Sequence, residues 1–301
     1  MANPLLLLPD FLLIFLGWIL CHRTALDRPV WEAAERLVYY LLFPVLLFNS
    51  IARSPLQPSQ AMNLAAAGVG TLLCGIALAY ALMHGPRVDA RLHASGAQTI
   101  FRFNSFIAFA VAERLSGAEG LARMALVIAL CVPIANVAAV FPLARHGGHS
   151  YWRELARNPL ILATLAGLIA NAASLQLPEA FATTLQRIGL AALPLGLMAV
   201  GAGLHLGRLK AAPGFAAVLL ALRHAALPAI AIGITFALGL TEGQGAIVVL
   251  FAAVPTASSA YVLASRMGGD GPFVAGLVTV STLLGMLSIP LWLAVQAALP
   301  H

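Results

Sequence analysis

Charged residues are scarce in this sequence of 301 residues. Only 9% are Asp, Glu, Lys or Arg, whereas 61% are hydrophobic; a soluble domain carries about a quarter charged residues. A chain so poor in charge cannot cover a water-facing surface. Long apolar runs recur along the whole sequence, and each is long enough to cross a hydrocarbon core of roughly 30 Å. The composition therefore predicts a polytopic protein of the lipid bilayer.

Signatures of several functional classes are also missing. The net charge is +6, but no basic stretch forms the footprint of a nucleic-acid-binding protein. The three cysteines stand alone, without the paired spacing of a metal site. No GxSxG or HExxH motif of a hydrolase occurs. No Walker A motif occurs either, which argues against a self-contained ATP-driven pump. We expect no nucleic-acid partner, no metal, no cofactor and no enzymatic activity.

Apolar segments follow one another with short linkers. The first has no basic n-region or cleavage site and is read as a retained span. The longest polar stretch, residues 144–158, divides the chain nearly in half. We expect a five-span repeat at residues 1–144, a cytoplasmic linker at 145–158 and a second five-span repeat at 159–301. The ten segments are expected at residues 4–21, 34–52, 62–83, 97–114, 121–144, 159–176, 189–206, 214–238, 244–265 and 272–298.

The positions of Lys and Arg predict how the chain is oriented. Cytoplasmic linkers carry an excess of these residues. With the N-terminus outside, the cytoplasmic linkers hold ten of them: Arg23, Arg28, Arg87, Arg91, Arg145, Arg153, Arg157, Arg208, Lys210 and Arg266. The other linkers hold four: Arg53, Arg114, Arg123 and Arg187. Both termini are therefore predicted outside, which is the periplasmic side in a bacterial inner membrane.

Short matches relate the two halves of the sequence in the same order. Their offsets are nearly constant: 158 − 3 = 155 for Asn158 and Asn3, 194 − 44 = 150 for Pro194 and Pro44, and 266 − 114 = 152 for Arg266 and Arg114. Each half has an odd number of spans, so the second half enters the membrane from the opposite side. Inverted repeats of this kind are typical of secondary transporters. The predicted fold is all-α, with ten transmembrane helices in two inverted five-helix repeats.

Polar clusters interrupt the fourth and ninth apolar segments at related positions. They consist of Asn104 and Ser105 in the fourth, and Pro255, Thr256, Ser258 and Ser259 in the ninth. Pro255 lacks an amide hydrogen and breaks or kinks its helix, and the hydroxyls or Asn104 can cap the half-helix that follows. Two half-helix N-termini near the midplane would attract an anion, most simply a carboxylate. The alternative is that these side chains bond to their own helices and aid packing.

Four further polar residues in or near the spans are candidates. Arg102 can attract an anion, or can be an interfacial arginine that snorkels. Asp10 can carry a coupling proton, lie among headgroups or pair with an arginine. Asn49 and Asn136 can line a cavity. Glu113 and Arg114 are expected to pair at the outer end of the fourth span, and Arg223, His205 and His224 are weaker candidates.

Several strings resemble the auxin efflux carrier family, which includes bacterial permeases and plant auxin exporters. They are LVYYLLFPVLLFNSIA, RFNSFIAFA, RNPLILATLAGLIANAASLQLP, AALPLGLMAVGAGLHL and VPTASSAYVLASRMGGD. By resemblance, spans one, two, six and seven form a scaffold, and the others form a transport domain crossed by broken helices four and nine. Asn104 and Pro255 match the family's crossover residues. Many relatives carry Gly or Pro after the asparagine; here Phe106–Ala110 has neither.

These observations favour a secondary transporter of a small organic anion that works by an elevator-type movement. The resemblance also implies a homodimer through the scaffold, and the lack of an acidic cluster at either crossover argues against a sodium site. The alternatives are a non-transporting membrane sensor or structural protein on the same fold, or an intramembrane enzyme. A serine within reach of His205 or His224 in a water-filled cavity would favour the enzyme.

Overall fold

The computed structural model describes residues 8–53, 58–84, 89–143, 159–175, 177–204, 209 and 212–299. The predicted linker at 145–158, and with it the predicted division of the chain, lies outside these residues, as does His205. The described residues are helical and form no strand beyond one isolated bridge between Phe103 and Thr256, so the predicted all-α class is confirmed. The elements are α1 (Leu8–Arg23), α2 (Arg28–Leu37), η2 (Val38–Leu42), α3 (Phe43–Ala52), α4 (Pro58–Ala81), η3 (Leu82–His84), α5 (Ala90–Gly96), α6 (Gln98–Phe101), α7 (Ser105–Leu143), α9 (Pro159–Ala172), α10 (Glu179–Leu190), α11 (Ala192–Ala202), α12 (Pro213–Ala221), η5 (Leu222–Ala226), α13 (Leu227–Ala237), α14 (Glu242–Ala253), α15 (Ser259–Arg266) and α16 (Gly271–Ala298).

Six stretches of helix among the described residues are long and apolar enough to cross a membrane. They are Arg28–Ala52, Ala61–Ala81, Ser105–Val140, Glu179–Ala202, Pro213–Ala237 and Gly271–Ala298. Leu162–Ala172 and Glu242–Ala253 are shorter apolar helices. The short length of Glu242–Ala253 agrees with a divided span, because a half-helix cannot reach the length of a full span.

The long helix α7 is divided by a sharp turn. Ser116 and Gly117 have non-helical backbone angles, and Gly117 lies in the left-handed region with φ +58°, which glycine adopts without steric cost. A Cβ placed on Gly120 would lie only 2.1 Å from the carbonyl oxygen of Ala112. Residues eight apart in one straight helix would be about 12 Å apart. The chain therefore folds back here, between the segments that the sequence predicts as spans four and five.

Two membrane-crossing helices contain a π-helical turn ahead of a proline. Pro44 is the second residue of α3, which directly follows η2, and Pro228 is the second residue of α13, which directly follows η5. A proline donates no hydrogen bond to the carbonyl four residues earlier and clashes with it. The released carbonyl of His224 instead accepts a hydrogen bond from the Trp292 indole at 2.7 Å. Such turns often occur at functional sites, and each of these holds a residue of the site described below.

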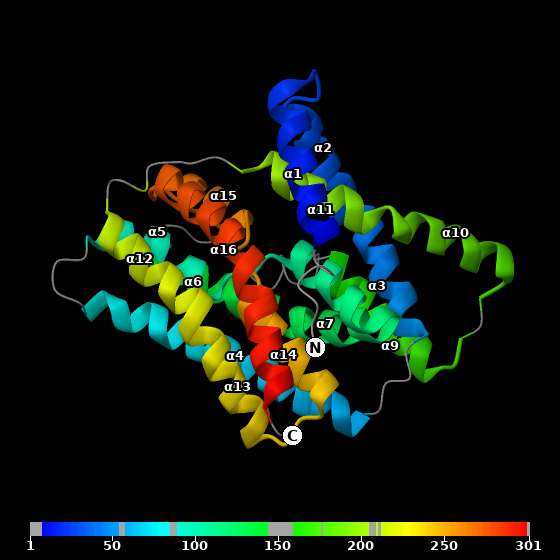
Figure 1. Cartoon of the computed structure of the whole chain (residues 1–301). Helices are drawn as coiled ribbons and strands as arrows, with labels where there is room; N and C mark the ends of the chain where they lie inside the picture. Colours follow the sequence, from blue (N-terminus) through cyan, green and yellow to red (C-terminus); the bar gives the residue numbers. More distant parts are fainter. Residues whose placement is uncertain are drawn as a thin grey trace.

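The helices pack in two groups (Figure 1). In one group α1 packs on α11, and α3 packs on α9 and α10. In the other α4 packs on α7 and α13, and α14 packs on α13 and α16. Helix α7 also touches α3, α11 and α9 and so joins the groups. At this junction the rings of Phe43 and Phe106 stack with centroids 5.0 Å apart.

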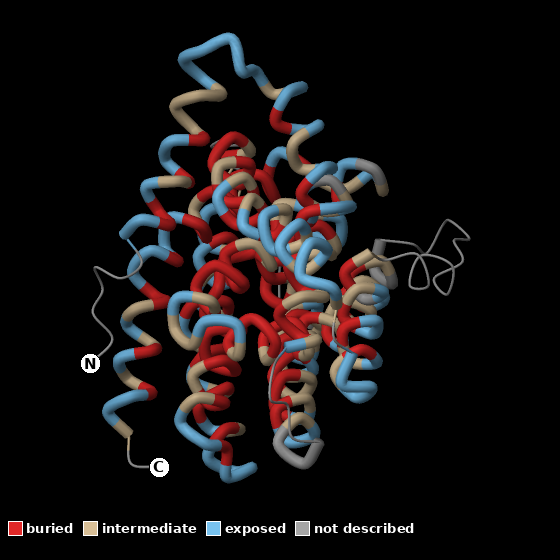
Figure 2. Tube along the Cα trace, turned by 90° about the vertical axis from the view of Figure 1, so that its right-hand side faces the viewer, coloured by how far each residue is buried: buried red, intermediate tan, exposed pale blue. Residues whose placement is uncertain are grey.

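Buried segments lie toward the middle of the molecule, and exposed segments lie toward its periphery (Figure 2). Glycines let α1 and α11 approach closely in the first group. A Cβ on Gly201 would lie 1.7 Å from the carbonyl oxygen of Ile14, and one on Gly17 would lie 1.9 Å from that of Met198. Large apolar side chains such as Ile169 and Leu287 are 70% and 73% exposed. An outer surface of this kind suits contact with lipid.

Candidate functional site

Two helices stop in the interior of the protein, and the chain crosses itself there. Helix α6 ends at Phe101, and Arg102 adopts an extended conformation. Helix α14 ends at Ala253, and Val254 is extended in the same way. The two extended segments run antiparallel, and the backbone amide of Asn104 donates to the Pro255 carbonyl oxygen at 2.9 Å. The interruption of both segments therefore agrees with the sequence prediction, even though the fourth has neither glycine nor proline after its asparagine.

Asn104 forms the cap of the half-helix that follows the first interruption. Its Oδ1 accepts hydrogen bonds from the amides of Phe106 at 3.0 Å and Ile107 at 3.2 Å. These amides are among the donors left without partners at a helix start. The predicted cap is confirmed, and it explains why the helix restarts without a glycine or proline. The Asn104 side chain is 3% exposed. Its Oδ1 and the two amides are already hydrogen-bonded to each other.

The predicted hydroxyl cap on the second half-helix is wrong. Ser258 is the N-cap residue of α15, but its side chain makes no capping bond. Thr256 instead donates from Oγ1 to the Thr99 carbonyl oxygen at 2.7 Å, and its amide donates to Ser281 Oγ at 2.9 Å. These partners lie on the adjacent helices α6 and α16. Thr256 therefore joins its extended segment to α6 and α16 and does not cap α15.

Arg102 joins the two crossover segments on the side where both half-helices begin. Its Nη2 donates to Ser259 Oγ at 2.9 Å. A cavity of about 250 Å³ lies here, lined by Tyr39, Arg102, Phe103, Ser105, Val132, Ala135, Asn136, Leu160, Ala257 and Ser259. Four of the predicted site residues thus meet in one place: Arg102, Ser105, Asn136 and Ser259. Of the other predicted crossover residues, Ser258 lines the larger cavity described next, and Asn104, Pro255 and Thr256 are buried.

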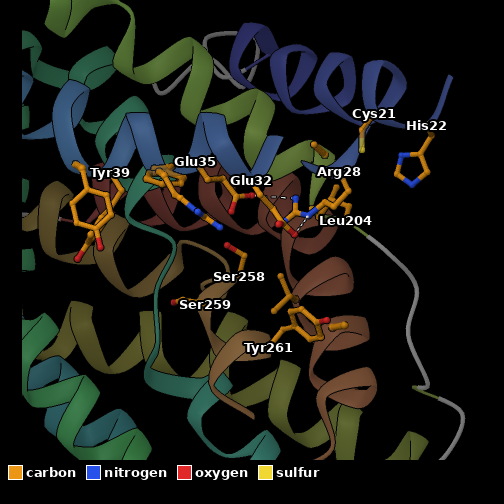
Figure 3. A pocket seen from close by; sticks show the side chains of 17 residues that line it. Cys21, His22, Arg28, Glu32, Glu35, Tyr39, Leu204, Ser258, Ser259 and Tyr261 are labelled. Carbon is orange, nitrogen blue, oxygen red and sulfur yellow. Dashed lines mark ion pairs between the residues drawn. The ribbon is translucent and has the colours of Figure 1, made fainter. Parts of the chain in front are cut away.

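A larger cavity of about 670 Å³ adjoins the first and shares Tyr39 and Ser259 with it. In Figure 3, residues of α2 lie on one side of it, with Ser258, Ser259 and Tyr261 on the other. Arg28 in α2 lies 3.1 Å from Glu35 and 3.5 Å from Glu32. The acidic residues of this wall are therefore already paired with a resident arginine.

The positive end of the crossover has no acidic partner. The ion pairs among the described residues join Arg28 to Glu32 and Glu35, Arg114 to Asp10, and Arg123 to Glu119. None of them involves Arg102. The N-termini of α7 and α15 add partial positive charge at the same place. The arrangement can therefore receive an anion that brings its own negative charge.

Asp10 lies away from this cavity and forms an ion pair. Arg114 Nε donates to Asp10 Oδ2 at 2.6 Å, and Asp10 is 6% exposed. The expected pairing of Arg114 with Glu113 is wrong, because consecutive residues of a helix do not face each other. Asp10, Glu113 and Arg114 line a separate cavity of about 340 Å³. The pair joins α1 to α7, across the two packing groups.

Comparison with known sequences decides the family. Residues 143–293, just over half of the chain, match the family described as "Membrane transport protein". The chain belongs to this family, the auxin efflux carriers. It is 26% identical to a "Putative malonate transporter" of Rhizobium meliloti, over 98% of this chain and 97% of the relative. It is 27% identical to an "Uncharacterized transporter" of Methanothermobacter thermautotrophicus, over 97% and 98% respectively. The protein is thus a multi-pass membrane transporter.

His224 is the residue on which the alternative of an intramembrane enzyme depends. Its ring nitrogens lie 2.8 Å from Ser281 Oγ and 2.9 Å from Ser288 Oγ. All three residues are buried and line none of the cavities described above. The pairs join η5 to α16 behind the crossover of this auxin efflux carrier. Membership of a transporter family also favours transport over catalysis.

The structure gives Tyr39 and Arg223 a closer relation to the crossover than the sequence suggests, and gives Asn49 a more distant one. Tyr39 lies on η2 and lines both cavities of the crossover. Arg223 lies on η5 and is 2% exposed. Each stands five residues before a proline inside a helical segment, a signal that could have identified both. Asn49, a predicted cavity residue in α3, is half-buried and lines none of the described cavities.

Proposed function

We propose that this protein is a secondary transporter of a small organic anion, most simply a carboxylate. One observation carries the proposal: Arg102 and the N-termini of two half-helices meet at one cavity, and no described carboxylate forms an ion pair with Arg102. A helix start offers free amides and partial positive charge, which suits an anion. Discontinuous helices at the centre of transporters bind substrate carboxylates in this way.

The charge at the crossover favours a dicarboxylate. Each helix start contributes roughly +0.5 of an elementary charge, and Arg102 adds a full charge. The sum of about +2 is balanced by a dianion. Asn104 occupies two amides of α7, so the nearest donors are Arg102, Ser105, Ser258 and Ser259. A guanidinium can hold a carboxylate through two parallel hydrogen bonds. The name of the Rhizobium relative, which refers to the dicarboxylate malonate, agrees with this substrate class.

Ten spans in two inverted repeats account best for the arrangement of the interruptions. The bridged residues Phe103 and Thr256 are separated by 256 − 103 = 153 positions, within the range of offsets between the sequence halves. The turn at Gly117 divides α7 into two arms, which brings the first half to five spans. We therefore assign residues 1–144 and 159–301 to the two repeats, with 145–158 between them.

An elevator-type movement fits the two packing groups. The group of α1, α3, α9, α10 and α11 would be the scaffold, and the group that holds the crossover would move. Their junction contains the stacked rings of Phe43 and Phe106, an apolar contact that can slide without losing a specific hydrogen bond. The ion pair of Asp10 with Arg114 would have to separate during the movement. A coupling proton on Asp10 would favour that separation, because it removes the negative charge.

In the orientation predicted from Lys and Arg, the larger cavity opens to the cytoplasm. Its wall includes Arg28, at the predicted cytoplasmic end of the second span, whereas Asp10 lies at the opposite end of α1. The substrate would then reach the crossover from the cytoplasmic face of a bacterial inner membrane. A homodimer through the scaffold stays a prediction.

Transport by the purified protein in liposomes tests the proposal. We expect uptake of radiolabelled malonate or a related dicarboxylate, competition by unlabelled anion, and little uptake by liposomes that contain Arg102→Gln. A ligand present at a hundred times its Kd stabilises a folded protein by about 2.7 kcal/mol, so the same anions should raise the melting temperature. If no mono- or dicarboxylate is taken up or raises the melting temperature, the proposed function is wrong.

A further inference from the structure

Arg223 is a charged residue in the interior of the protein, behind the crossover. Its side chain is 2% exposed, and it projects from the π-helical turn η5. Moving an isolated charge from water into a protein interior is costly unless the charge is paired and hydrogen-bonded. The partners of this guanidinium therefore indicate why an arginine occupies the position.

The partners of Arg223 are the carbonyl ends of both interrupted helices. Nε donates to the Val254 carbonyl oxygen at 2.8 Å, and Nη2 donates to the same oxygen. Nη1 donates to the Ile100 carbonyl oxygen at 2.9 Å. Val254 directly follows the last residue of α14, and Ile100 lies in the short helix α6, which ends one residue later. One side chain thus joins two segments that are 154 positions apart (254 − 100).

Both partners carry the negative end of a helix. The last carbonyls of a helix lack intrahelical partners, and they hold about half a negative charge. Two such ends point at the guanidinium, so one positive charge balances roughly one negative charge. No ion pair among the described residues involves Arg223. Its electrostatic partners are therefore the helix ends themselves.

We propose that Arg223 is a positioning residue that fixes the geometry of the anion site through these two carbonyls. The proposal rests on the proposed function of the crossover. Val254 directly precedes Pro255, whose carbonyl accepts from the Asn104 amide at 2.9 Å. Ile100 lies in α6, two residues before Arg102, which belongs to the other extended segment. Arg223 thus binds the chain where each extended segment begins, and Arg102 and Ser259 follow farther along the two segments.

The crossover therefore has two kinds of counter-charge: Arg223, which belongs to the protein, and the transported anion. The negative helix ends are neutralised by a side chain that stays with the protein. Among the described residues no carboxylate forms an ion pair with Arg102, which leaves the place beside the positive helix ends for the substrate. When Arg223 is lost, the two negative helix ends repel each other and the extended segments shift. The hydrogen-bond donors that bind the anion then no longer point to one place.

The test compares Arg223→Gln, Arg223→Lys and Arg223→Ala in liposomes and in thermal unfolding. Gln removes the charge, Lys keeps it, and Ala leaves a space into which methylguanidinium fits. Tyr80→Phe is the matched control, since Tyr80 donates to the Ala138 carbonyl oxygen at 2.6 Å and links α4 to α7 away from the crossover. It removes one internal hydrogen bond without touching the charge balance.

For Arg223→Gln we expect a rise in KM for the dicarboxylate of about tenfold or more, which corresponds to 1.4 kcal/mol. Arg223→Lys should retain a KM near that of the natural protein. Millimolar methylguanidinium should raise the melting temperature of Arg223→Ala and lower its KM, and should leave Tyr80→Phe unchanged. Tyr80→Phe should lower the melting temperature at unchanged KM.

A folded Arg223→Gln with unchanged KM would overturn the proposal, as would equal stabilisation of Arg223→Ala and Tyr80→Phe by methylguanidinium. If Gln and Ala do not fold but Lys folds and transports, the need for the charge is supported. If none of the three folds, Arg223 is a structural residue only and the proposal fails. Failure of the natural protein to take up any carboxylate would instead refute the proposed function, while the methylguanidinium shift would still report on Arg223.

Discussion

Arg102 and Ser259, 157 positions apart in the chain, are joined by a hydrogen bond of 2.9 Å between Nη2 and Oγ. Each stands beside the start of a different half-helix, and both line the same cavity. The bond therefore closes the crossover on the side where an anion would bind. A bound carboxylate would compete with Ser259 for the guanidinium, so this pair is the first place to test the site.

Replacement of Arg102 by Gln should lower the affinity for the anion. A hydrogen bond to a charged group contributes about 1.5–3 kcal/mol, which corresponds to a loss of roughly ten- to a hundredfold. Ser259→Ala should have a smaller effect, because the guanidinium stays in place. Isothermal titration or thermal shift with a dicarboxylate measures both. Equal affinity in Arg102→Gln and the natural protein would exclude Arg102 from the site.

Replacement of Asn104 separates capping from anion binding. Asn104→Ala removes the bonds to the Phe106 and Ile107 amides, and loss of such a cap costs about 1 kcal/mol of stability. Asn104→Asp should keep the cap but place a carboxylate at the helix start, where it repels the substrate. We expect a lower melting temperature for Ala, and weaker anion binding at a retained melting temperature for Asp. Undiminished transport by folded Asn104→Asp would contradict an anion site at this helix start.

The ion pair between Asp10 and Arg114 is suited to a double-mutant cycle. Asp10→Asn, Arg114→Gln and the double variant should give a coupling energy of about 1–3 kcal/mol, between the values for exposed and buried pairs. If Asp10 carries a coupling proton, Asp10→Asn also removes the dependence of transport on a pH gradient. Transport in Asp10→Asn that keeps this dependence would assign proton coupling to another residue.

The close contact of α1 with α11 predicts a large effect of one methyl group. In Gly201→Ala the added Cβ would lie 1.7 Å from the Ile14 carbonyl oxygen, so the helices must separate, at a cost of about 1–3 kcal/mol. Gly233→Ala is the control, since nothing lies within 4 Å of its Cβ position in α13. That variant should be neutral or stabilised by up to about 1 kcal/mol. Unfolding of both proteins in detergent measures the difference.

Much of the fold follows from local sequence properties. Apolar length predicts the membrane-crossing helices, and Pro255 predicts the break after α14, because proline cannot continue a helix. Asn104 predicts the restart of α7, because its amide oxygen satisfies two orphan donors. The hydroxyl cap of α15 is a wrong prediction for a related reason. Thr256 can equally bond to other backbone groups, and the choice depends on which neighbours are in reach.

Sequence position alone could not place the charged residues of the interior. The local order of Glu113 and Arg114 favours a pair between them, yet Arg114 bonds to Asp10, which is 104 positions away. Arg223 looks like a stray arginine in an apolar segment until its three donors are seen to meet two helix ends. In both cases the packing of helices that are distant in the sequence brings the partner into reach. The sequence of a single segment does not indicate which distant helix will pack against it.

By itself the sequence determined that this protein lies in a membrane, is built of helices and interrupts two of them at related positions. These features depend on composition and on the backbone preferences of single residues, which act over one helix turn. Only the tertiary structure decided which charges remain available. Arg28 and Arg114 are paired with carboxylates, Arg223 faces two carbonyl ends, and Arg102 is left beside two helix starts. Whether two charges pair depends on their distance in space, and the crossing of the two interrupted segments sets that distance.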